Sequence, residues 1–289
     1  MRNVYGCRPS SLEEALGFLR LCERNSRTVK VVAGGTDVMP RALANPGIFG
    51  DCLLDVSSVD GLSGISESGG RLLIGPCCTH SFIASSDLVR SKIPMLAKAC
   101  STIGSPQIRN RGTIGGNVCN ASPVGDTLPS LYVLDAEIRL ESIDPDGKRS
   151  VRIVPVSEFI KGPGRTVISP CELLTGIFLE IPAESELCEF RRSMTRKALS
   201  ITKASVAFRA DVVDGVFRGV RIALGSVGPV IMPAHACERL IEGSKPGDDL
   251  GDRIEAAVME DCSPIDDIRS TREYRRHVVA VFLRRIVSP

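Results

Sequence analysis

The sequence predicts an α+β protein of two domains, for three reasons. With 289 residues, the chain can bury more than one hydrophobic core. A β-branched strand over 28–33 is followed by its sheet partner over 52–56, too soon for the long strand–helix alternation of a doubly wound fold. In the last third of the chain, three strands precede three helices, which is the order of an α+β domain. We therefore expect domains over 1–182 and 183–289.

The first domain is expected to divide near residue 60. Its first subdomain, about 1–60, begins with a helix over 10–24, where Ser11 and Glu14 have the spacing of a capping box. For the second subdomain, about 61–182, glycine and proline punctuation separates short elements. We expect a hairpin over 62–75, helices from 79 and over 94–103, a glycine-rich loop near 104–127, a short helix over 129–134, a hairpin over 137–155 and a strand over 173–181.

The C-terminal domain is expected to combine a three-stranded sheet with helices. The strongest local signal is Asp214-Gly215, a dipeptide typical of a type I′ hairpin turn. The expected strands cover 190–194, 203–213 and 216–224, and the expected helices cover 234–242, 250–262 and 271–287.

Composition excludes several classes of function. The net charge is only +2 and no basic block is present, so a nucleic-acid partner is not expected. No apolar run is long enough to span a membrane and no leader is recognisable, so we expect a cytoplasmic protein without a membrane partner. The eleven cysteines are scattered without any C-x2-C pair, so we expect neither a zinc site nor an iron–sulfur cluster in this chain.

Two glycine pairs are the main candidates for a binding site. Gly34-Gly35 ends the strand over 28–33, and Gly115-Gly116 lies in a polar stretch that continues to Asp126. Adjacent glycines allow positive φ, and successive amides in such a turn can form an anion-binding nest. Pyrophosphate oxygens would suit these amides, and a ribose diol would suit Asp126. Two nests suggest a single ligand that is held from both sides.

The ordered motifs carry a resemblance to a known family. They are AGGTD (33–37), PQIRNRGTIGGN (106–117), ASPVGDTLP (121–129), LDA (134–136), RKALSI (196–201) and the SxxxYR pattern of 270–275. Together they resemble the FAD-binding medium subunit of the molybdenum hydroxylases, a family that includes xanthine dehydrogenases and carbon monoxide dehydrogenase. The resemblance covers nearly the whole chain. It implies a two-part FAD-binding domain of the PCMH (vanillyl-alcohol-oxidase-like) type, followed by a smaller α+β domain.

The resemblance also implies which residues bind FAD. Those along the diphosphate and ribityl chain would be Val31, Val32, Ala33, Gly34, Gly35, Thr36, Asp37, Val38, Thr113, Ile114, Gly115, Gly116 and Asn117. Asp126 would hold a ribose or, through its neighbours, the edge of the pyrophosphate. Ile103 and Leu174 would cover the two faces of the flavin ring, and Arg192 stands where the family has a lysine near the flavin. These last three could also be ordinary core or surface residues. Arg109 and Arg111 would either offset phosphate charge or anchor the loop.

The function implied by the resemblance is electron transfer. A small partner subunit with [2Fe–2S] clusters would supply electrons to FAD in this chain, which would pass them to NAD+ or another acceptor, while a large subunit would carry the molybdenum cofactor. No catalytic side chain and no metal ligand are expected here, since none of the three histidines (His80, His235, His277) stands near a glycine pair in the sequence. Two alternatives remain open: a flavin-free assembly scaffold, and a stand-alone FAD/NADH reductase.

Overall fold

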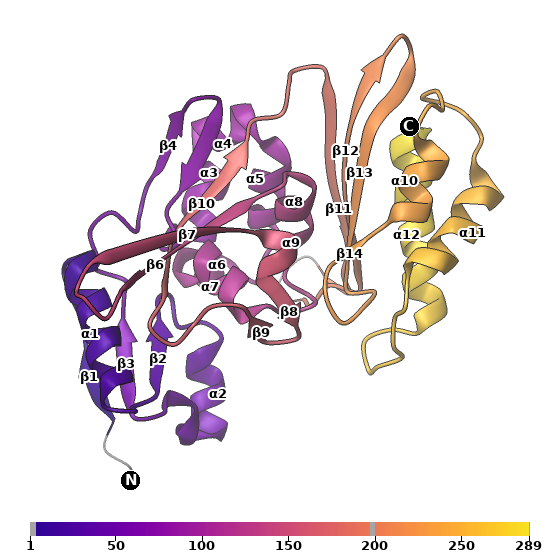
Figure 1. The fold of residues 1–289 in the computed structure, drawn as a ribbon. Helices are drawn as coiled ribbons and strands as arrows, with labels where there is room; N and C mark the ends of the chain where they lie inside the picture. The colour runs from indigo at the N-terminus through magenta and orange to yellow at the C-terminus, as the bar shows by residue number, and fades with distance from the viewer. Residues whose placement is uncertain (1–3, 197–199, 289) are drawn as a thin grey trace.

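A computed structural model describes residues 4–196 and 200–288, and within these ranges it places the three larger sheets in sequence order across the molecule (Figure 1). Three of the six residues of the RKALSI motif, 197–199, lie outside the described residues. No helix within the described ranges has the length and apolar character needed to cross a membrane.

The N-terminal subdomain, indigo in Figure 1, is a small parallel sheet with the strand order β1-β3-β2. Its elements are β1 (Tyr5–Cys7), α1 (Leu12–Arg24), β2 (Val29–Val32), α2 (Val38–Ala44), a 3-10 turn (Pro46–Phe49) and β3 (Cys52–Asp55). The capping box at the start of α1 is confirmed, because Ser11 accepts the Glu14 amide and Glu14 accepts the Ser11 amide. The three-residue strand β1 was not predicted from the sequence.

The second subdomain is an antiparallel five-stranded sheet with helices on one face. Its strands are β4 (Ile65–Ser68), β5 (Arg71–Ile74), β6 (Glu137–Ile143), β7 (Arg149–Pro155) and β10 (Leu173–Glu180), in the order β4-β5-β10-β6-β7. The side chains that alternate toward the helices form the main core, among them Ile74, Ile138 and Ile177. Both predicted hairpins are confirmed, and the predicted strand over 173–181 corresponds to β10.

Seven helices and a small hairpin complete this subdomain as the structure describes it. They are α3 (His80–Ser85), α4 (Asp87–Lys92), α5 (Pro94–Ser101), α6 (Pro106–Arg111), α7 (Ile114–Asn120), α8 (Leu128–Val133), α9 (Val156–Phe159), β8 (Ile160–Gly162) and β9 (Arg165–Thr166). Two of them, α6 and α7, occupy the stretch that was expected to be a glycine-rich loop. That expectation is wrong, and the reason lies in the site described below.

The C-terminal part is an antiparallel sheet between two layers of helices (Figure 1). Its elements are β11 (Glu186–Ser193), β12 (Ala204–Val213), β13 (Val216–Gly225), β14 (Met232–Pro233), α10 (His235–Ile241), α11 (Gly251–Asp261) and α12 (Arg272–Val287). The type I′ turn is confirmed by positive φ at both Asp214 and Gly215. The two-residue strand β14 extends the predicted three-stranded sheet.

The C-terminal sheet is buried on both faces, and this joins the two parts of the chain. One face packs Phe190, Ala207 and Ala223 into the core that contains the helices of the second subdomain. The other face packs Phe208 and Leu224 against α10 and α12. Contacts between residues of β11 and residues of the first domain therefore lie in a water-poor junction, where polar groups need partners.

Candidate functional site

A cavity of about 330 Å³ lies between the loop that joins β2 to α2 and the segment that contains α6 and α7. This volume is within the range of small-molecule sites. The cavity brings together most of the residues predicted from the sequence, namely Val31, Val32, Ala33, Gly34, Gly35, Thr36, Asp37, Val38, Ile103, Thr113, Gly116 and Asn117. Of the remaining five, Ile114 lies in the hydrophobic core, and Gly115, Asp126, Leu174 and Arg192 lie elsewhere around the site.

The first glycine pair is required by close packing and by backbone conformation. A Cβ on Gly34 would lie 1.8 Å from the carbonyl oxygen of Arg111, so only glycine lets the loop approach the end of α6. Gly35 has a φ of +72°, in the left-handed region that glycine adopts without steric cost. The loop is thus held tightly against α6 and turns sharply into α2.

The amides of this loop have no acceptor within the described residues. None of the backbone N–H groups of Gly34–Val38 makes an intramolecular hydrogen bond there, and the Asp37 side chain does not cap α2. Asp37 instead pairs with Arg41 at 3.1 Å. Buried or half-buried amides without an acceptor normally find one in a ligand or in water. The first glycine pair therefore has the free donors that an anion site needs.

The second glycine pair is not an anion-binding nest, which corrects the sequence-based interpretation. Gly115 and Gly116 lie in the first turn of α7, which Thr113 caps by accepting the Gly116 amide at 3.1 Å. The Ile114 and Gly115 amides donate to the carbonyls of Cys78 and Pro76, and the Asn117 amide donates to Thr113. The amides of Ile114–Asn117 are all used internally.

Close approach explains why glycine stands at these two positions. A Cβ on Gly115 would lie 2.5 Å from the Pro76 side chain and 2.8 Å from the Pro76 carbonyl oxygen. Gly116 is exposed on the cavity side of α7, where a Cβ would meet only the Thr113 hydroxyl, at 2.9 Å. Gly115 lets α7 approach the chain at Pro76, and Gly116 leaves room in the cavity because it has no side chain.

A second cavity of about 430 Å³ adjoins the first and has a more apolar lining. Leu174 borders this second cavity, together with Gly115, Pro76 and Val56. The two cavities share Lys30, Val31, Ala33, Gly116 and Cys119. The two cavities therefore adjoin at β2 and α7, and we call them together the cleft.

His80 lines the first cavity, although the sequence placed no histidine near a glycine pair. The backbone N–H of His80 donates to the Gly112 carbonyl at 3.0 Å, and Thr79 pairs with Thr113 as an isolated bridge. The imidazole is buried, and its Nδ1 has no hydrogen-bond partner within the described part of the chain. Burial, reinforced by the nearby Arg109 charge, lowers the pKa of His80 to about 4, so the ring is neutral at physiological pH.

Asp126 and Arg192 lie together at the junction of the two domains, outside the lining of the first cavity. The Arg192 Nη1 atom is 2.5 Å from the Asp126 carboxylate and 2.8 Å from the Thr102 carbonyl oxygen. Burial raises the pKa of Asp126 to about 6, although the Arg192 charge and the Thr202 hydroxyl both act to lower it. Because Thr102 precedes Ile103, this ion pair lies next to one end of the first cavity.

The two arginines of α6 have different environments. Arg109 donates to the Ile103 carbonyl at 2.9 Å, which supports the loop-anchoring alternative for this residue. Arg111 is exposed, and its carbonyl rather than its side chain contacts the glycine loop. Lys30 and Arg41 also line the first cavity, although the sequence analysis did not select them. Lys30 and Val32 are two residues apart in strand β2, so their side chains lie on the same face of the strand. The sequence alone could therefore have indicated that Lys30 accompanies Val32 at the site.

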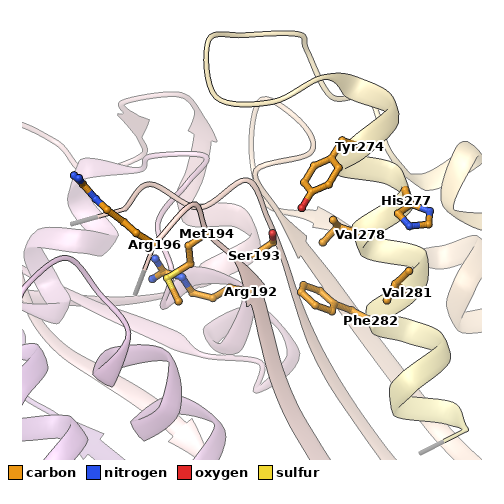
Figure 2. A pocket seen from close by; sticks show the side chains of 9 residues that line it. All are labelled: Arg192, Ser193, Met194, Arg196, Tyr274, His277, Val278, Val281 and Phe282. Carbon is orange, nitrogen blue, oxygen red and sulfur yellow. The ribbon is translucent and has the colours of Figure 1, made fainter. Parts of the chain in front are cut away.

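Another cavity, of about 540 Å³, is bordered by Arg192 and by residues of α12 (Figure 2). Tyr274, Val278 and Phe282 project from α12 toward Ser193 and Met194 at the end of β11. Its walls are mainly apolar and it lies apart from both glycine pairs. The converging free donors lie in the smaller cavity, which we therefore take as the functional site.

Comparisons with known proteins agree along the whole chain. Residues 2–183 match the family described as "FAD binding domain in molybdopterin dehydrogenase", and residues 189–289 match the "CO dehydrogenase flavoprotein C-terminal domain". The glyceraldehyde dehydrogenase medium chain of Sulfolobus acidocaldarius is 34% identical, over 95% of this chain and 93% of that one. The xanthine dehydrogenase FAD-binding subunit of Escherichia coli O157:H7 is 26% identical, over 97% and 94%.

A solved structure has the same architecture. A chain of carbon monoxide dehydrogenase from Hydrogenophaga pseudoflava superposes with a TM-score of 0.88 and 26% identity, covering 98% of this chain and 95% of that one. The similarity includes both the glycine-containing cleft and the C-terminal sheet, since it covers nearly every residue.

Proposed function

The chain belongs to the family of FAD-binding medium subunits of molybdenum hydroxylases, and from this premise we propose that it passes electrons from [2Fe–2S] clusters of a partner subunit to NAD+ or another acceptor. It is an oxidoreductase subunit with an FAD-binding domain. The large molybdenum-cofactor subunit, the small iron–sulfur subunit and the cytoplasmic location are parts of this proposal. Bound FAD would connect one-electron delivery with two-electron release.

The free amides of Gly34–Val38 are the observation that carries the proposal. They supply hydrogen-bond donors without acceptors at one wall of the cleft, where a diphosphate would accept them. Lys30 adds a positive charge where the two cavities of the cleft adjoin. Gly116 borders both cavities, and a Cβ there would meet only the Thr113 hydroxyl among protein atoms, so a side chain at this position would take up room beside the ligand. The residues present therefore suit a dinucleotide.

Other residues would orient the flavin half of the ligand. Ile103 and Ile108 give the first cavity an apolar end, which suits a planar ring. Asp126 and Arg192, behind Ile103, would fix that end rather than bind the diphosphate. Leu174 borders the second cavity, so we propose that its contact is with another part of the same ligand.

The first experiment is an absorption spectrum of the purified chain before and after heat release of any cofactor. We expect a flavin spectrum and released FAD. The variant Gly116→Val should fold but lose most of its flavin, because the branched side chain fills the cavity wall. Gly17→Val is the matched control, since Gly17 is also a helical glycine and an added Cβ there meets nothing within 4 Å.

The outcomes separate the proposal from its alternatives. Full flavin content in Gly116→Val would contradict the assigned site. A wild-type protein that stays colourless after incubation with FAD would favour the flavin-free scaffold. Affinity purification at native expression tests the partners: recovery with two other subunits supports the proposal, and recovery of this chain alone favours a stand-alone reductase.

A further inference from the structure

A buried polar network joins the two domains next to Ile103. Arg192, on β11 of the second domain, donates to Asp126 and to the carbonyl of Thr102, both in the first domain. Thr202, in the segment before β12, donates its hydroxyl proton to the other oxygen of Asp126. The side chains of Arg192, Asp126 and Thr202 are all nearly inaccessible to solvent. Each oxygen of the Asp126 carboxylate is thus bonded to a different element of the second domain.

The network holds the backbone at one end of the first cavity. The Thr102 carbonyl is held by Arg192, and the next carbonyl, of Ile103, is held by Arg109 of α6. Two consecutive carbonyls are therefore fixed by guanidinium groups from different domains. Ile103 lines the cavity, so its position depends on where both arginines are held.

We propose that Thr202 is a positioning residue for the flavin-binding site, because through Asp126 it holds Arg192 against Thr102 and so fixes the cavity wall at Ile103. This rests on the proposed function, since it needs a flavin in the first cavity. Arginine suits the role because its Nη1 reaches Asp126 and Thr102 while its Nη2 reaches the Ser200 carbonyl, whereas lysine has a single nitrogen for all three acceptors.

The chain contains a second network of the same chemistry that serves as a control. Thr175 donates its hydroxyl to buried Glu141 at 2.7 Å, and Arg139 lies 3.2 Å from the same carboxylate. This network links β6 to β10 within the five-stranded sheet, and none of its three residues lines either cavity of the cleft. The Thr175 hydroxyl also accepts a hydrogen bond from Arg139 Nε at 3.0 Å, so its loss measures the structural cost of breaking a buried network of this kind away from Ile103.

The test compares Thr202→Val, Thr202→Ser and Thr175→Val in the full chain. Thr202→Val keeps the shape but removes the donor, so we expect FAD to bind about tenfold more weakly. We also expect a shift of the bound flavin absorption bands. Thr202→Ser should restore wild-type affinity and spectrum. Thr175→Val should lower the melting temperature, but should leave FAD affinity within about twofold and the spectrum unchanged.

Each outcome decides the proposal. If Thr202→Val matches Thr175→Val in affinity and spectrum, the positioning role is wrong. If Thr202→Val does not fold, Arg192→Lys takes its place: unchanged affinity and spectrum there overturn the proposal, and the expected shift supports it. Failure of the wild-type chain to bind FAD would instead overturn the proposed function, on which this inference depends.

Discussion

The loop of Gly34 and Gly35 and the helix of Gly115 and Gly116 border the same cleft, but their amides have different partners. In the loop, the amides of Gly34–Val38 have no acceptor within the described residues. In the helix, the corresponding amides donate to Cys78, Pro76 and Thr113. The same dipeptide is thus a source of free donors at one wall and a closely packed helix start at the other.

The comparison shows that the two glycines of each pair have different roles, one in close packing and the other in shaping the cleft. Gly34 and Gly115 permit close packing, because a Cβ on either would collide with backbone atoms of a neighbouring segment. Gly35 and Gly116 shape the cleft instead, the first through its left-handed backbone and the second through its missing side chain. A glycine pair in a sequence therefore does not by itself indicate an anion nest.

The largest expected effect is that of Gly34→Ala. The added Cβ would lie 1.8 Å from the Arg111 carbonyl oxygen, so the loop or α6 must move. We expect a loss of about 3 kcal/mol or more in the free energy of unfolding. Gly35→Ala is the control within the pair: its Cβ would meet only the side chains of Met39, at 3.2 Å, and Val32, at 3.8 Å, and the left-handed backbone costs about 1–2 kcal/mol. Urea denaturation of both variants gives the ranking, and equal losses would contradict it.

A second prediction concerns His80, which lies beside Gly112 just before the second pair. Its folded-state pKa of about 4 is below the ordinary value of 6.5, so only the unfolded chain takes up a proton between these values. The free energy of unfolding is therefore not reduced by His80 above about pH 6.5, and it falls by about 3 kcal/mol as the pH drops from 6.5 to 4. His80→Gln should lack that loss in urea titrations at a series of pH values. If the free energies of unfolding of the wild type and of His80→Gln fell in parallel with decreasing pH, the ring would not be buried as described.

The fold was largely predictable because its signals are local. Asp214-Gly215 specifies a hairpin turn, and Ser11 with Glu14 specifies a helix start, whatever the rest of the chain does. The sequence-based predictions failed for elements that depend on contacts with distant parts of the chain. The first turn of helix α7 contains two adjacent glycines, each about 1 kcal/mol unfavourable for a helix relative to alanine, so the local sequence favours a loop. Capping by Thr113 and packing on Pro76 reverse that preference.

The site was predictable in part for the same reason. The loop residues were found because the strand–glycine pattern is continuous in sequence. His80 was missed because its place depends on the pairing of Thr79 with Thr113, 34 positions apart in the numbering. Asp126 follows the second glycine pair closely in sequence, but α7 intervenes and the carboxylate reaches Arg192 of the other domain instead.

The smallest expected change in stability is that of Gly116→Ala. Alanine favours the helical backbone by about 1 kcal/mol, and displacement of the Thr113 cap costs about the same, so the free energy of unfolding should stay near the wild-type value. FAD affinity should still fall, since Gly116 borders both cavities of the cleft and the methyl group takes up room there. Gly115→Ala should show the opposite pattern of a clear loss of stability, because its Cβ meets Pro76. If both variants instead lost stability equally, the separation of packing from cavity-shaping within this pair would be wrong.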